Sequence, residues 1–148
     1  VVAHEMAHAL FSNLSKKEIK FFEENGFHLA GKQVCEENPH VGWSYYQIIE
    51  DIRSEKLMKR KYKGINRDFT LGYAELMEED FFGLRQNHEL TLIDKLNVYF
   101  KARYSCPVPF SFNEEELNFV EMCETVETSD DVLSVAKKVF EYCKQKKE

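Results

Sequence analysis

The apolar residues of this chain recur mostly at intervals of three and four positions, the spacing that places side chains on one face of an α-helix. Nowhere do apolar and polar residues alternate for long enough to predict a β-strand. Gly, Pro and Asn residues separate the helical stretches. The pattern therefore predicts an all-α fold, with helices over residues 1–13, 15–26, 43–62, 72–85, 91–104, 114–124 and 131–145.

Capping residues and prolines define several of these ends. Asn113 precedes three glutamates and is expected to cap the helix that ends at Glu124. Ser129 or Asp130 is expected to cap the last helix. The prolines of "CPVPF" cannot continue a helix, because they lack an amide proton and clash with the preceding turn. Between residues 27 and 41 we expect a short helix followed by a loop at "ENPHVG".

Composition narrows the class of protein. A chain of 148 residues, 43% hydrophobic and 31% charged, is typical of a single globular domain with its own core. The net charge of −6 argues against a nucleic-acid partner, and the apolar runs are too short for a membrane span. The four cysteines show no close pairing, which favours reduced thiols and a cytoplasmic location.

The stretch "VVAHEMAHALFS" carries the spacing His-Glu-x-x-His. His4 and His8 are four residues apart, so on a helix they lie on one face and can both reach a single Zn²⁺ ion. Glu5 lies one residue round from His4, where a general base for a zinc-activated water is needed. The rest of this helix is uncharged, and a buried carboxylate between two imidazoles needs a partner that a dication supplies. The sequence therefore predicts a zinc site.

A catalytic zinc ion usually takes three protein ligands, and no histidine follows His8 at a short spacing. On the long central helix, Glu50 shares a largely apolar stripe, whereas Asp51 lies on a more polar side. Glu50 is therefore the predicted third ligand, and Asp51 is predicted to hold a ligand histidine through its other ring nitrogen. His40 and His88 stay open as ligands or oxyanion donors. The full set of candidates is Glu50, Asp51, His28, His40 and His88.

Two further features of the central helix have ordinary interpretations. Arg53 lies on the same stripe as Glu50, and we expect it to form a salt bridge. The basic run over residues 56–67 is expected to be a solvated helix end, where positive side chains suit the negative C-terminus of the helix.

"AHEMAHALF" followed by "IIEDIRSEKLMKRKYKGINRDF" resembles a family of phage and bacterial metallopeptidase-like domains. These domains are joined to a von Willebrand A domain and are similar to the cobaltochelatase subunit that carries such a domain. The segments "LTLIDKLNVYFKARYSCPVPF" and "DDVLSVAKKVFEYCK" are also similar to the family. The resemblance implies a helical zincin-like core with a gluzincin-type site, in which His4, His8 and Glu50 hold zinc and Glu5 is the base.

The chain starts at the motif-bearing helix without a Met, so we expect a fragment of a longer phage or bacterial protein. Within a single domain over residues 1–148, the metal-site helices would span about 1–105 and a C-terminal helical extension about 106–148. A von Willebrand A domain would lie beyond Glu148, and the resemblance implies an AAA+ partner.

The predicted function is a zinc-dependent peptidase that acts on a protein or peptide substrate. Two alternatives stay open. In the first, the chain is a non-catalytic interaction module in which zinc joins two helices inside a larger assembly. In the second, it is a metal-free helical bundle in which His4, Glu5 and His8 bond to protein groups alone.

Overall fold

The computed structural model describes His4, Met6, Ala7 and residues 28–84 and 89–147. Among these residues, all regular structure is helical and no strand occurs, so the predicted all-α class is confirmed. The helices are α3 (His28–Val34), α4 (Pro39–Lys61), α5 (Ile65–Glu78), α6 (Leu92–Ala102), α7 (Glu114–Glu124) and α8 (Ser129–Lys147). His4, Met6 and Ala7 are helical, as predicted, and the rest of the first two predicted helices lies outside the described residues.

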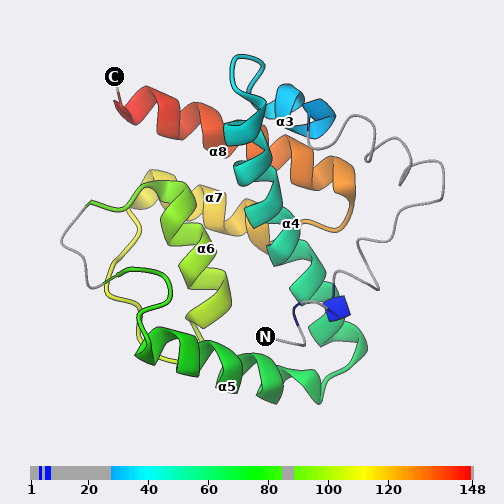
Figure 1. Cartoon of the computed structure of the whole chain (residues 1–148), viewed down its shortest axis with the longest axis vertical. Coiled ribbons are helices and arrows are strands. Elements are labelled where there is room, and N and C mark those ends of the chain that lie inside the picture. Colours follow the sequence, from blue (N-terminus) through cyan, green and yellow to red (C-terminus); the bar gives the residue numbers. More distant parts are fainter. Residues whose placement is uncertain (1–3, 5, 8–27, 85–88, 148) are drawn as a thin grey trace.

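The central element is α4, which contacts each of the other five helices. Figure 1 shows α3 and α8 beside its N-terminal half and α5 beyond its C-terminal end. No helix among the described residues is both long and apolar enough to cross a membrane. Because α3, α5, α6, α7 and α8 all pack on α4, the side chains of α4 decide which of these distant segments meet.

The start of α4 differs from the prediction, which set it at residue 43. Asn38 caps the helix by accepting a hydrogen bond from the Val41 amide at 3.4 Å. Pro39 occupies the first helical turn, where a missing amide proton costs nothing. The loop predicted at "ENPHVG" is therefore wrong from Pro39 onward, because the proline starts the helix instead of preventing it.

The position of α5 also differs, since the predicted helix over residues 72–85 lies at Ile65–Glu78. It starts directly after Gly64 and ends before Asp80, whose φ of 55° lies in the left-handed region. Gly72 was expected to begin this helix and instead lies inside it.

Local capping signals set the ends of the C-terminal helices. α7 has the predicted cap, because Asn113 accepts from the Glu116 amide at 2.8 Å and the Glu116 side chain accepts from the Asn113 amide at 3.0 Å. For α8 the predicted cap was Ser129 or Asp130. The cap is instead Thr128, whose hydroxyl accepts from the Asp131 amide at 3.1 Å.

The main hydrophobic core joins α3, α4, α6, α7 and α8. Both the part before residue 105 and the part after it therefore contribute to one core. A second, smaller cluster lies where the C-terminal end of α4 meets α5. Its members are Ala7, Met58, Phe69 and Tyr73.

Two glycines allow a close approach between α3 and α4. A Cβ atom added to Gly42 would lie 2.0 Å from the carbonyl oxygen of Gly31. A Cβ atom added to Gly31 would lie 2.1 Å from the Pro39 carbonyl oxygen. Only glycine allows the two backbones to pack at this separation.

We therefore expect Gly42→Ala to lower the free energy of unfolding by about 1–3 kcal/mol, the usual cost of overpacking. Gly64→Ala is the matched control, because a Cβ atom there meets nothing within 4 Å. It should change the stability by less than about 1 kcal/mol. Urea denaturation followed by circular dichroism measures both, and equal effects would contradict the close packing of α3 on α4.

Candidate functional site

The imidazole of His4 lies between two carboxylates of α4. Its Nδ1 is 2.6 Å from Glu55 Oε1, and its Nε2 is 3.6 Å from Asp51 Oδ1. Asp51 and Glu55 are four residues apart on α4, so their side chains share one face of the helix. Each ring nitrogen of His4 therefore faces a different carboxylate.

Packing of the neighbouring Ala7 holds His4 in this position. Ala7 lies three residues after His4 and is fully buried against Met58 of α4 and Phe69 and Tyr73 of α5. Residues three apart on a helix lie on the same side. The apolar contact of Ala7 thus brings the His4 ring onto the polar face of α4.

Glu55 is the most deeply buried carboxylate of this group, with 3% of the residue exposed. Its Oε1 accepts hydrogen bonds from His4 and from the hydroxyl of Tyr73. The same hydroxyl is 3.4 Å from His4 Nδ1. A buried carboxylate is stable only with such donors, so the three groups form one buried polar cluster.

The two oxygens of Asp51 face different groups. Oδ1 faces His4, and Oδ2 accepts from Lys101 Nζ of α6 at 3.1 Å. Both side chains of the Asp51–Lys101 pair are mostly buried, at 16% and 15% exposure. The lysine fixes the rotation of the carboxylate and leaves Oδ1 directed toward His4.

Glu50 lies on a different face of α4 and pairs with Arg53. Its two carboxylate oxygens accept from Arg53 Nε at 3.0 Å and from Nη2 at 2.6 Å. This confirms the salt bridge expected for Arg53. The hydrogen bonds that Arg53 donates to Glu50 raise the pKa of Arg53, which also donates to the Glu127 carbonyl oxygen at 3.3 Å. Arg53, held by Glu50, therefore joins α4 to the segment between α7 and α8.

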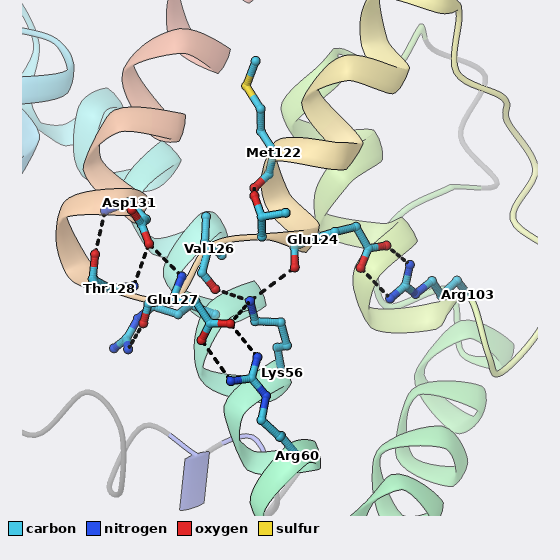
Figure 2. A network of polar contacts seen from close by, with 11 residues as sticks. Lys56, Arg60, Arg103, Met122, Glu124, Val126, Glu127, Thr128 and Asp131 are labelled. Atoms are coloured by element: carbon cyan, nitrogen blue, oxygen red, sulfur yellow. Dashed lines mark hydrogen bonds and ion pairs between the residues drawn. The ribbon is translucent and has the colours of Figure 1, made fainter.

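Two more basic side chains of α4, those of Lys56 and Arg60, form hydrogen bonds with the same segment, as Figure 2 shows. Lys56 Nζ donates to the carbonyl oxygens of Glu124, at 3.2 Å, and of Val126. Arg60 forms a two-pronged pair with the Glu127 carboxylate, at 2.6 and 3.1 Å. These contacts connect α4 with the α7–α8 segment.

The other sequence-predicted residues lie apart from this cluster or outside the described residues. His40 is exposed in the first turn of α4, and its carbonyl accepts from the Ser44 hydroxyl at 3.0 Å. His28 begins α3. Glu5, His8 and His88 lie outside the described residues. Within the described part of the chain, no three His, Cys, Asp or Glu side chains are grouped so that they could hold a metal ion.

Comparison of the chain with protein-family models, curated proteins and solved structures finds no match. The site is therefore interpreted from its own geometry.

Glu55 lies in the stretch "IIEDIRSEKLMKRKYKGINRDF" that resembles the metallopeptidase-like family, but no role at this site was predicted for it. Its spacing of four residues from Asp51 was available as a signal, because that spacing places two carboxylates on one helix face. No sequence signal identifies Tyr73 or Lys101, since both reach the site from helices whose packing only the tertiary structure gives.

If Glu50 is mainly a structural partner of Arg53, replacing Arg53 alone removes two donors from a buried carboxylate. We expect Arg53→Met to lower the free energy of unfolding by about 3–5 kcal/mol. The double variant Glu50→Met with Arg53→Met should recover most of that loss, because no unpaired charge stays buried. Urea denaturation of the three proteins measures the coupling.

Arg60→Met is the control for this experiment, because it removes an arginine whose side chain is 58% exposed. It should cost much less than Arg53→Met. A double variant as unstable as Arg53→Met would show that the pair is not the source of the loss.

Proposed function

We propose that this chain is a zinc-dependent peptidase that holds the ion with His4, His8 and a carboxylate of α4. Glu5 would act as the general base. The observation that carries the proposal is the position of the His4 ring between Glu55 and Asp51.

Glu55 has the position of a group that orients a metal-binding histidine. Its carboxylate oxygen is 2.6 Å from His4 Nδ1, close enough to accept the proton of that nitrogen. A neutral imidazole that donates from Nδ1 keeps its lone pair on Nε2. Histidines that bind metals are commonly held in this way by a carboxylate. Tyr73 in turn donates to Glu55 and restrains its rotation.

Asp51 is the carboxylate of α4 that best suits the third position. Two ligand atoms of a tetrahedral zinc ion, each about 2.1 Å from the metal, lie about 3.4 Å apart. The 3.6 Å between Asp51 Oδ1 and His4 Nε2 is close to that value. Glu50, the ligand predicted from sequence, would have to give up hydrogen bonds from Arg53 to both of its oxygens. In this proposal Asp51 takes the ligand role expected for Glu50, and Glu55 takes the histidine-orienting role expected for Asp51. Glu50 is kept as the alternative ligand.

A zinc ion held by these residues would supply a Lewis acid that activates water near neutral pH. Glu5 would take a proton from the attacking water and deliver it to the leaving amine. Lys101 keeps one oxygen of Asp51 engaged and so directs the other. Glu55 and Tyr73 hold the imidazole of His4 in one tautomer and one orientation.

A metal-free interpretation of the same geometry is a protonated His4 that forms ion pairs with both carboxylates. Metal content separates the two interpretations. We expect the purified protein to carry about one zinc ion per chain by elemental analysis, and Asp51→Asn to lose most of it because amides are poor zinc ligands.

Glu50→Gln is the matched control, since glutamine keeps the length of the side chain and an acceptor for Arg53. It should retain zinc. Loss of zinc in Glu50→Gln but not in Asp51→Asn would restore the ligand predicted from sequence. Absence of zinc from the unaltered protein would overturn the metal site, and circular dichroism verifies that each variant is folded.

The role of Glu5 is tested by Glu5→Gln, which should keep zinc and lower the hydrolysis of fluorophore-labelled casein by at least about 100-fold. The loss follows because the amide cannot accept a proton from water. Zinc binding without any hydrolysis by the unaltered protein would favour the non-catalytic module over the peptidase. Unchanged hydrolysis by Glu5→Gln would exclude Glu5 as the base.

A further inference from the structure

A cavity of about 410 Å³ adjoins the candidate site and shares Glu55 with it. Its volume falls in the range of pockets that bind small ligands. Exposed Asn66, Tyr104 and Glu124 line its edge, where it meets solvent. Its walls come from α4, α5, α6 and α7, with two apolar residues, Ile52 and Phe100, among the lining.

The lining carries three cations and two carboxylates, in a chain whose net charge is −6. Two of the cations are already engaged. Lys56 donates to backbone carbonyls of the α7–α8 segment, and Arg103 pairs with Glu124, as Figure 2 shows. The third cation is Lys59. If all five groups are ionised, the cavity has an excess of one positive charge.

The ammonium of Lys59 lies against aromatic rings. Its Nζ is 5.1 Å from the ring centre of Phe69 and 5.9 Å from that of Tyr104. Among the described residues, no hydrogen-bond or ion-pair partner of Lys59 is found within the usual distances. Burial lowers the pKa of Lys59, with Glu55 opposing and Arg103 adding to the effect. An anion bound in the cavity would stabilise the charged form of Lys59, which burial disfavours.

Two other side chains of the lining, Cys123 and Glu55, are poorly suited to bind an anion. The thiol of Cys123 lines the cavity and is fully buried. Burial raises its pKa to about 12, so it stays protonated at neutral pH and is a poor nucleophile. Glu55 is already held by His4 and Tyr73. Lys59 is therefore the group that can recognise a ligand by charge.

We propose that this cavity binds one carboxylate of a peptide substrate through Lys59, so that peptides carrying a carboxylate at the matching position are preferred. The inference rests on the proposed peptidase function, because Glu55 joins the cavity to His4. Lys59, for which the described residues provide no ion-pair partner, supplies one positive charge, which matches one carboxylate. A phosphate dianion needs more donors than Lys59 alone supplies, since Lys56 and Arg103 are occupied. The carboxylate can come from an acidic side chain or from a peptide C-terminus.

The test uses the full chain treated with EDTA, so that binding is measured apart from zinc and hydrolysis. Three acetylated alanine pentapeptides are the probes. The first has a central glutamate and an amidated end, the second a central glutamine and an amidated end, and the third a central glutamine and a C-terminal carboxylate. Titration of ¹⁵N-labelled protein followed by NMR gives each dissociation constant.

We expect the first or the third peptide to bind at least about tenfold more tightly than the second, as a charge-assisted hydrogen bond would give. The peptide that is preferred identifies the source of the carboxylate. Lys59→Met should abolish the preference. Lys63→Met removes the same charge from an exposed position outside the cavity and should preserve it.

Equal binding of the three peptides, binding of none, or a preference that survives in folded Lys59→Met would overturn the proposal. Its failure is distinguishable from failure of the zinc site. A zinc-loaded protein without a carboxylate preference would contradict only the cavity proposal, whereas a carboxylate preference in a protein that never holds zinc would contradict only the peptidase.

Discussion

The charged segment of α4 from Glu50 to Glu55 lies largely inside the protein, and an unpaired charge in such an interior costs several kcal/mol. The partners of this segment come from elements that are distant in sequence. Tyr73 arrives from α5, Lys101 from α6, and the carbonyl of Glu127 from the segment between α7 and α8. The helices around α4 thus have to pack so that they satisfy its polar groups as well as bury its apolar ones.

Neighbouring residues of α4 consequently have different surroundings, because successive side chains on a helix point about 100° apart. Glu50 and Arg53 face the α7–α8 segment and form a contact that stabilises the fold. Asp51 and Glu55 face His4, where we propose the metal site. Between these two faces, the basic side chain of Lys59 lies in the cavity that adjoins Glu55.

The sequence-based predictions are accurate where a feature depends on residues that are close together in the chain, and they fail where it depends on tertiary packing. α7 lies where it was predicted because Asn113 and the following glutamates form a complete local cap. α5 begins seven residues earlier than predicted, since Gly72 is tolerated inside a helix when Phe69 and Tyr73 bury its neighbouring turns. The expectation of a solvated basic end of α4 is wrong for Lys59, which is partly buried beside Phe69.

The sequence by itself determined the helical class, the cap of α7, the spacing of the motif that contains His4, and the Glu50–Arg53 pair. Each of these depends on residues within a few positions of one another. Only the tertiary structure decided that Asp51 and Glu55 face His4 and that Lys59 lines a cavity. Helical periodicity tells which residues share a face, but the rotation of a helix about its axis relative to its neighbours depends on the packing of the whole core.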